Sequence, residues 1–176
     1  MQRSVREVEF TEYVAARRAQ LRRTAYLLCG DSHRAEDLVQ VALVRLYGAW
    51  PRLRRDHDHS VDAYARRIVV NAHLDETRRG WRRERVGLDL FGAEPSTQPG
   101  QDAVEERDEL IGALQQLPEG QRRVVVLRHY WGLSVQETAQ DLGISAGTVK
   151  SQTSAGLAGL HRLLSTTNDD RSHRVP

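Results

Sequence analysis

Cysteine is nearly absent from the sequence, since Cys29 is the only one among 176 residues. A single cysteine excludes an internal disulfide and a metal site built from several cysteines, and we interpret Cys29 as a buried structural thiol. Long apolar runs are also missing: the longest span four or five residues, as at 124–127, against the ~18 that a membrane-spanning helix requires. No apolar stretch follows the first residues, so we expect no signal peptide, no membrane insertion and a cytosolic protein.

Charge is nearly balanced but unevenly distributed, with 26 basic and 24 acidic side chains and a formal net charge of +2. Residues 52–85 hold ten arginines against six acids, and residues 121–164 hold five basic residues against two acids. Residues 86–110 between them hold seven acids and one arginine. Two basic blocks separated by an acidic one indicate two surfaces that meet an anion, although charged residues also simply solvate helix faces.

Helical periodicity runs through the first half of the chain. Apolar residues spaced by three and four predict a helix over residues 10–29 that ends at Gly30. A second predicted helix, residues 32–50, is apolar on more than one face and is expected to be the central helix, ended by Pro51.

A third helix is predicted over residues 61–79, after a polar loop at residues 54–60. Ser60 or Asp62 is the expected N-cap, and Gly80 the expected stop. The glycine- and proline-rich stretch that follows, to about residue 101, shows no sustained periodicity and is typical of a linker.

Helices resume from residue 104, and Pro118 fits the first turn of one that runs to about Tyr130. A polar, frayed tail is expected from Ser165. With no strand pattern anywhere, the sequence predicts an all-α protein of two small helical domains joined by a flexible acidic linker. The expected division is residues 1–80, a linker at 81–103, a second domain at 104–165 and a tail at 166–176.

Residues 134–157 have the pattern of a helix-turn-helix. Ser134 and Glu137 form a capping box, Gly143 fits a left-handed turn, and Ala139 and Val149 fit the positions where the two helices cross. Ser145 can cap the second helix, whose predicted inner face is Val149, Thr153, Leu157, Leu160 and Leu164. Its short polar groups and one cation suit a DNA major groove, although a helical hairpin with solvated residues gives the same pattern.

Arginine and asparagine recur on one stripe of the third predicted helix. Arg67, Asn71 and Arg78 share this stripe, with Arg66 and His73 on the adjacent one. Such residues beside a polar loop can bind a nucleic-acid backbone and a base edge, and a solvated face is equally compatible with the spacing.

The cluster Asp56-His57-Asp58-His59 contains metal-binding residue types. Four consecutive residues cannot all face one ion without a folded cage, so we expect no metal here. No phosphate-binding glycine loop, nucleophile elbow or metalloprotease motif is present, and we expect neither a cofactor nor catalysis.

Several segments together resemble the extracytoplasmic-function sigma factors of bacterial RNA polymerase, closest to the SigE-like subgroup of actinobacteria. Residues 21–31, 35–40 and 64–79 are similar to sigma region 2, and residues 117–128, 133–139 and 147–151 to region 4. Both halves occur in the order and spacing of that family and cover about residues 9–80 and 104–164.

The resemblance implies a role for particular residues. Asp37, Leu38 and Gln40 match the box that binds the β′ clamp helices of core polymerase. A second group matches the family's site for a flipped base of the −10 element: its members belong to the loop that captures the base, line the site or flank it. They are Arg54, Asp56, His57, Asp58, His59, Arg67, Asn71 and Arg78. Residues on or capping the helix that matches −35 recognition are Ser145, Thr148, Lys150, Ser151, Gln152 and Ser154.

The family also implies partners: promoter DNA, the β flap of the polymerase and an anti-sigma factor, with a monomer as the free state. We hypothesise that the acidic linker occupies a site on the polymerase that nucleic acid later takes. Neutralising Asp89, Glu94 and Asp102 tests this hypothesis. Four residues depart from the family pattern: Val41 replaces a glutamate, and Gln152, Ala155 and Gly159 stand on the recognition helix where arginines are common.

Three other functions remain compatible with parts of the sequence. A stand-alone helix-turn-helix regulator would bind DNA without polymerase but leaves residues 36–40 unexplained. A metal enzyme based on residues 56–59 would be inhibited by chelators. Ala155 and Gly159 are compatible with a polymerase-bound protein that no longer recognises promoters.

Overall fold

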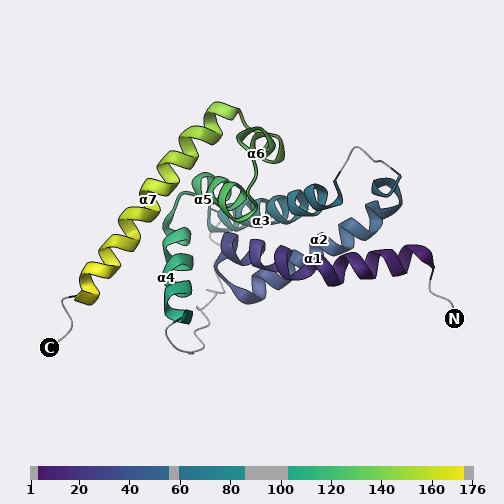
Figure 1. Ribbon diagram of the computed structural model, residues 1–176, viewed down its shortest axis with the longest axis horizontal. Coiled ribbons are helices and arrows are strands. Elements are labelled where there is room, and N and C mark those ends of the chain that lie inside the picture. Colours follow the sequence, from purple (N-terminus) through teal and green to yellow (C-terminus); the bar gives the residue numbers. More distant parts are fainter. Residues whose placement is uncertain (1–3, 56–59, 86–102, 173–176) are drawn as a thin grey trace. The chain divides into compact units, whose positions relative to one another are not determined.

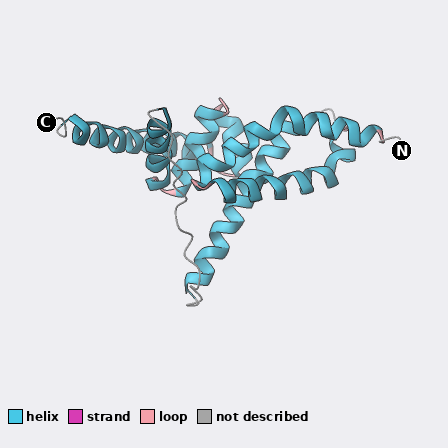
Figure 2. Cartoon of the chain, turned by 90° about the horizontal axis from the view of Figure 1, so that it is seen from below, coloured by secondary structure: helices cyan, strands magenta, loops and turns pink. Residues whose placement is uncertain are grey.

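The computed structural model describes residues 4–55, 60–85 and 103–172, and the side chains of residues 4–55, 60–79 and 108–166. Every regular element in these ranges is helical, as Figures 1 and 2 show, which confirms the predicted all-α class. The chain divides into two compact units, Met1–Ser96 and Thr97–Pro176. Of the linker predicted at residues 81–103, residues 81–85 instead form the end of a helix and residue 103 begins the next one, whereas residues 86–102 lie outside the described residues.

The first unit contains the helices α1 (Val5–Cys29), α2 (Ser32–Leu53) and α3 (Val61–Arg85), which all pack against one another. Local capping sets their ends: Ser4 and Glu7 form a capping box at the start of α1, and Gly30 ends it in the left-handed conformation with φ 70°. Asp31 then accepts a hydrogen bond from the Arg34 amide and begins α2.

The core of the first unit lies along α2, as expected for a central helix. Its buried side chains are Ala35, Leu38, Val39, Ala42, Leu46, Trp50 and Leu53. They meet buried residues of α1, such as Leu21 and Leu28, and of α3, such as Val69. The single thiol, Cys29, is buried as predicted.

The predicted end of α2 at Pro51 is wrong, because the helix continues to Leu53 with Pro51 inside it. A proline lacks the amide hydrogen that would bond to the carbonyl four residues earlier, here that of Tyr47. The guanidinium of Arg6 donates to this carbonyl oxygen instead, over 2.6 Å. The helix therefore tolerates Pro51 because a distant side chain supplies the missing donor.

The predicted stop at Gly80 is also wrong, since α3 continues to Arg85. A glycine inside a helix costs only about 1 kcal/mol relative to alanine, which does not end a helix by itself. At the other end, the Ser60 hydroxyl accepts a hydrogen bond from the Ala63 amide at 3.3 Å, so Ser60 is the cap of the two alternatives. Asp62 binds side chains of α1 instead.

The second unit contains α4 (Ala103–Gln116), α5 (Glu119–Val125), a π-helical turn (Val126–Tyr130), α6 (Val135–Leu142) and α7 (Ala146–Ser172). The helix predicted at Pro118 begins one residue later, with Pro118 as its extended N-cap residue. The tail predicted to fray from Ser165 is helical to Ser172, because α7 continues without interruption.

The inner face of α7 differs from the prediction at one position. Val149 and Leu160 are buried, but Leu157 is 42% exposed. Gly156 and Gly159 are buried in its place, and a Cβ atom on either would lie 2.7 Å from a side-chain carbon of α5 or of the α4–α5 turn. The helices approach so closely that the glycines form the contact surface, which a count of apolar side chains misses.

Candidate nucleic-acid interfaces

The helix-turn-helix predicted in the second unit is formed by α6 and α7. Ser134 and Glu137 make the reciprocal capping box, and Gly143 ends α6 with φ 63°. The Ser145 hydroxyl accepts a hydrogen bond from the Thr148 amide at 3.0 Å and begins α7. Val124, Ala139 and Val149 form one buried cluster, so the small residue and the anchor meet where the helices cross.

The N-terminal turns of α7 present short polar side chains to solvent. Ser145, Lys150, Ser151 and Ser154 are exposed, while Thr148 is half-buried. The hydroxyl groups of Ser145 and Thr148 lie 2.8 Å apart in a mutual hydrogen bond. This arrangement, a positive helix end with hydroxyl groups and one amine, suits phosphates and base edges of a major groove.

Gln152 is the exception among the residues predicted on this surface. It is half-buried, and a Cβ atom added to Gly120 of α5 would lie 2.9 Å from its amide nitrogen. The Gln152 side chain therefore packs along α5, and less of it is available to a ligand than of Lys150 or Ser151.

The arginine and asparagine stripe predicted on α3 is only partly at the surface. Asn71 and Arg78 are exposed, and Arg67 is half-buried with its Nε donating to the Ala63 carbonyl at 3.3 Å. Arg66 and His73, which the sequence placed on the adjacent stripe, are buried at 6% and 3% exposure. These two residues belong to the core of the unit, whereas Asn71 and Arg78 remain accessible to a ligand.

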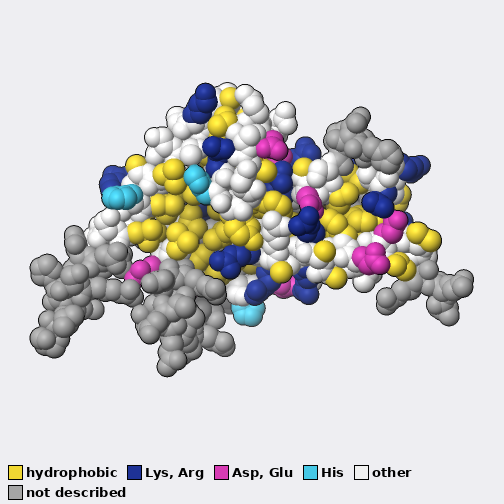
Figure 3. Space-filling view, in the orientation of Figure 1, with side chains coloured by type: hydrophobic (Ala, Val, Ile, Leu, Met, Phe, Trp, Pro, Cys, Tyr) yellow, Lys and Arg dark blue, Asp and Glu magenta, His cyan; other side chains and the backbone are white. Residues whose placement is uncertain are grey.

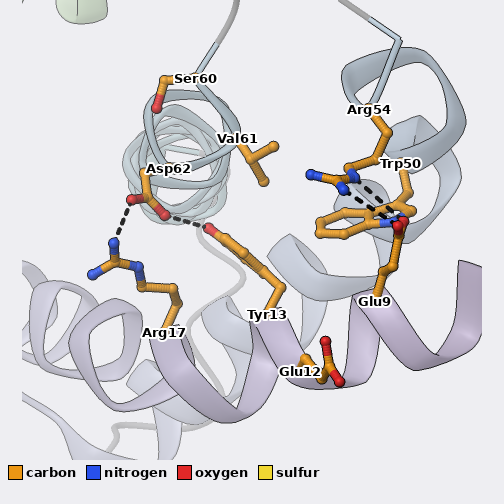
Figure 4. Close-up of a pocket in the computed structure, with 9 residues that line it drawn as sticks. All are labelled: Glu9, Glu12, Tyr13, Arg17, Trp50, Arg54, Ser60, Val61 and Asp62. Carbon is orange, nitrogen blue, oxygen red and sulfur yellow. Dashed lines mark hydrogen bonds and ion pairs between the residues drawn. The ribbon is translucent and has the colours of Figure 1, made fainter. Parts of the chain in front are cut away.

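The loop before α3 is described only at its ends, because Asp56, His57, Asp58 and His59 lie outside the described residues. Arg54 is exposed at the preceding end, and its guanidinium forms a two-pronged pair with the Glu9 carboxylate at 3.2 and 3.3 Å. No sequence pattern indicated this pairing (Figure 4), in which Glu9 of α1 binds a residue that was predicted to contact DNA.

The box of Asp37, Leu38 and Gln40, near the start of α2, has residues both in the core and on the surface. Leu38 is buried at 5% exposure, whereas Asp37 and Gln40 are exposed. Glu36 accepts hydrogen bonds from Arg18 and from the Gln40 amide, and Arg18 holds the pKa of the Glu36 carboxyl below its ordinary value. Of the three predicted box residues, only Asp37 and Gln40 can therefore contact a partner directly.

Two hydrophobic residues extend this exposed face of α2. Val41 is 41% exposed and Val44 is 72% exposed, and they follow Asp37 and Gln40 at helical spacing. An acid, an amide and two valines on one helix face suit contact with another protein more than contact with DNA phosphates.

On the face drawn in Figure 3, arginine and lysine side chains lie interspersed with acidic and hydrophobic ones.

Among the described residues, no group of three or more His, Cys, Asp or Glu side chains could hold a metal ion. None of the helices searched in that part of the chain has the length and hydropathy to span a membrane.

The helix-turn-helix of the second unit, with its polar second helix, is a DNA-binding motif, and the first unit is a separate three-helix bundle that exposes Asn71 and Arg78. Comparison with family models matches residues 13–83 to sigma-70 region 2 and residues 107–160 to sigma-70 region 4. The chain is 40% identical over 160 residues to an RNA polymerase sigma-E factor of Streptomyces coelicolor, covering 89% of this chain and 86% of that protein. It is 35% identical over 150 residues to the ECF RNA polymerase sigma factor SigM of Mycobacterium tuberculosis, covering 85% of this chain and 74% of that one.

The chain belongs to the sigma-70 family of RNA polymerase sigma factors, in its extracytoplasmic-function group. This membership confirms the family that the sequence resembled. Among solved structures, the sigma factor RpoE in complex with the anti-sigma factor NepR from Bartonella quintana is similar, with a TM-score of 0.77 at 24% identity. The match covers 89% of this chain and 97% of that one, and at this identity it supports the fold.

Proposed function

We propose that this sigma factor uses the two surfaces described above to recognise two promoter elements. A member of this family binds core RNA polymerase, recognises the −10 and −35 elements and promotes promoter melting. The observation that carries the assignment here is the helix-turn-helix, whose second helix presents Lys150, Ser151 and Ser154 beside a well-formed cap at Ser145. The division into two domains predicted from the sequence is part of this proposal, with the linker predicted at 81–103 reduced by the helices α3, which ends at Arg85, and α4, which begins at Ala103.

The −35 element is assigned to the start of α7. Lys150 contributes charge attraction to phosphate, and Ser145, Thr148, Ser151 and Ser154 contribute hydroxyl groups for base edges or phosphates. Gln152 contributes less, because its side chain packs along Gly120.

The −10 element is assigned to the loop and helix that follow α2. The exposed amide of Asn71 lies on α3, which also carries the half-buried Arg67 and the exposed Arg78, and Arg54 is exposed at the end of α2. We assign the base contact to Asn71 and the positive charge for the DNA backbone to the three arginines. A flipped base loses its stacking, so a site that captures it needs preformed contacts for the base and cations for the backbone. The loop residues Asp56 to His59 are assigned to this contact by family resemblance.

Core polymerase is assigned to two surfaces. The first is the α2 face of Asp37 and Gln40, extended by Val41 and Val44, with Leu38 acting from the core by fixing the helix. The second is a groove of about 840 Å³ between the α4–α5 turn and α7, where Leu117, Ala158 and Leu163 offer apolar surface for the β flap.

The remaining assignments concern partners and compartment. We propose that the protein works in the cytoplasm, has no catalytic activity of its own, needs no cofactor and is monomeric when free. The sigma factor RpoE from Bartonella quintana, which is similar in fold, was solved in complex with the anti-sigma factor NepR, and this supports an anti-sigma partner for this chain. The acidic linker is proposed to compete with nucleic acid on the polymerase, which neutralising Asp89, Glu94 and Asp102 would test.

In vitro transcription with purified core polymerase on a pool of promoter fragments tests the function. We expect start sites that depend on the protein, share two spaced elements and disappear with Asn71→Ala. His33→Ala, at an exposed position in the first turn of α2, is the control and should retain them. DNA binding by the protein alone without new start sites would indicate a stand-alone regulator instead.

A further inference from the structure

Helix α5 has no side chain at position 120, where α7 packs against it. A Cβ atom on Gly120 would lie 2.9 Å from the amide nitrogen of Gln152, 3.2 Å from its amide oxygen and 3.3 Å from its Cδ. One turn further along α7, a Cβ atom on Gly156 would lie 3.4 Å from the Cβ of Gln121, the neighbour of Gly120. The amide group of Gln152 therefore occupies the space that a side chain at position 120 would fill.

Gln152 lies on the boundary between two faces of α7. Residues three and four apart on a helix are neighbours, so Gln152 is flanked by Val149 and Gly156 on one side and by Thr148 and Ala155 on the other. Val149 and Gly156 are buried, whereas Thr148 is half-buried and Ala155 is exposed. The side chain at this boundary has two directions open to it, along α5 or along the exposed face, where Ala155 offers only a methyl group as an obstacle. In this structure it lies along α5 and is half-buried.

The direction of this side chain matters because the exposed face of α7 is the one assigned to the −35 element. Ser151 and Ser154 on that face are exposed, and a hydroxyl group can pair with several bases. A glutamine amide is more selective, since it donates to one atom of adenine and accepts from another in the major groove. Gln152 pointing along the exposed face would therefore add a base preference that the hydroxyl groups do not supply.

We propose that Gly120 is a positioning residue for promoter recognition: the space it leaves on α5 keeps the Gln152 amide away from the bases of the −35 element. This inference rests on the proposed function, in which the start of α7 binds that element. A side chain at position 120 would displace the Gln152 amide toward the exposed face, because the end of a flexible side chain moves more easily than the backbone of α5. The base preference of α7 is thus set partly by a residue of another helix.

The experiment is a selection of promoter DNA by holoenzyme assembled from core polymerase and the full chain. The DNA pool is one promoter that the wild-type holoenzyme uses, with its −35 element randomised, and the bound duplexes are sequenced. The variants are Gly120→Ala, Gln152→Met and the two together. Gln152→Met keeps a long, flexible side chain and removes the amide. The matched control is Gly112→Ala in α4 of the same unit, where a Cβ atom would meet no atom of the described residues within 4 Å.

Gly120→Ala should gain a preference for adenine, on either strand, at one position of the −35 element. We expect roughly five-fold, the lower end of the discrimination given by a bidentate glutamine–adenine pair. The double variant should lack this preference, because methionine has neither the donor nor the acceptor, and Gly112→Ala should keep the wild-type preferences. The urea midpoint of Gly120→Ala should not fall, since alanine is the better helix former, so this measurement separates positioning from misfolding.

Three results would overturn the inference alone. Unchanged base preferences in Gly120→Ala would show that Gly120 does not set the direction of the Gln152 side chain. A loss of binding that is equal on all −35 sequences would indicate a displaced helix. An adenine preference that the wild type already has and Gln152→Met removes would mean that Gln152 contacts the bases from its place along α5. A wild-type holoenzyme that selects no −35 sequence would overturn the proposed function and this inference with it.

Discussion

The Arg6 side chain takes the place of the amide hydrogen that Pro51 removes from α2. Its guanidinium donates to the Tyr47 carbonyl oxygen at 2.6 Å and lies 4.2 Å from the centroid of the Tyr47 ring. The same ring packs edge-on against Phe10 at 4.9 Å. One residue near the start of α1 therefore satisfies the backbone of α2 and covers an aromatic side chain.

Replacing Arg6 should destabilise the first unit. Arg6→Met removes the hydrogen bond and the cation–π contact but keeps an unbranched stem, and we expect a loss of about 1–2 kcal/mol in the free energy of unfolding. Urea unfolding, followed by hydrogen exchange of α2 amides, measures it. In a Pro51→Ala background the backbone again offers a donor to Tyr47, so the cost of Arg6→Met should fall by about 1 kcal/mol. If Arg6→Met cost as much in the Pro51→Ala background as in the wild type, Arg6 would not be replacing the amide donor that Pro51 lacks.

The buried glycines of α7 should not tolerate a methyl group. A Cβ atom at Gly156 would lie 2.7 Å from the Val125 side chain and 3.4 Å from the Gln121 carbonyl oxygen. Since Val125 is stiff and buried, we expect Gly156→Ala to cost about 1–3 kcal/mol in the free energy of unfolding. Gly159→Ala should cost less, because among the described residues the close atom is a terminal methyl of Leu117, which can move more easily.

The control for these substitutions is Gly112→Ala in α4, where a Cβ atom would meet no atom of the described residues within 4 Å. Alanine is the better helix former, so this change should be neutral or stabilise by up to about 1 kcal/mol. Unfolding of the full chain, monitored by exchange of amides in the second unit, compares the three variants. Equal effects at Gly112 and Gly156 would contradict the close approach of α7 and α5.

Most features that depend on neighbouring residues were predicted correctly from the sequence, and the helix stop expected at Gly80 is the exception. Gly30, Gly143 and the capping box of Ser134 and Glu137 all stand where predicted, because a helix cap involves residues only a few positions apart. The crossing of Ala139 with Val149 was also predicted, since a helix-turn-helix fixes both positions within one short segment.

Features that depend on distant residues were not predicted. Pro51 ends a helix in isolation, but Arg6 lies 41 residues before the carbonyl that it satisfies. The pairing of Glu9 with Arg54 crosses 45 residues and has no sequence signal beyond the spacing of Glu9, Tyr13 and Arg17 on one helix face. Gly159, taken from the sequence as a missing DNA contact, is buried beside Leu117, so it no longer argues for a protein that has lost promoter recognition.

Lys150 should strengthen promoter binding through its charge without contributing to sequence specificity. Because it is an exposed ammonium group at the start of α7, Lys150→Ala should weaken promoter binding by the holoenzyme to a similar extent on different −35 sequences. The slope of log affinity against log salt should fall by about 0.9, the value for one phosphate contact, over about 50–200 mM salt. Lys150→Arg keeps the charge and should keep the slope. An unchanged slope in Lys150→Ala would place this side chain away from the phosphates.

Cys29 should be unreactive in the folded protein. Burial raises the pKa of its thiol above the ordinary value of 9.0, and its sulfur donates to the Asp31 carbonyl oxygen at 3.2 Å. The reactive species is the thiolate, so a disulfide reagent at pH 8 should modify the folded chain at least about ten-fold more slowly than the chain in urea. Equal rates would show that the thiol is accessible.

The same raised pKa makes stability depend on pH in a defined direction. The folded state holds the thiol proton more tightly than the unfolded state, so the contribution is fully present below pH 9.0 and is lost as pH rises through the folded pKa. Burial also raises the pKa of Tyr13, which acts with the same sign at higher pH. Cys29→Ala keeps the tyrosine contribution and removes that of the thiol, so the free energy of unfolding should fall less steeply above pH 9.0 in this variant than in the wild type. Identical slopes in urea titrations at several pH values would mean that the thiol ionises as easily in the folded chain as in the unfolded one.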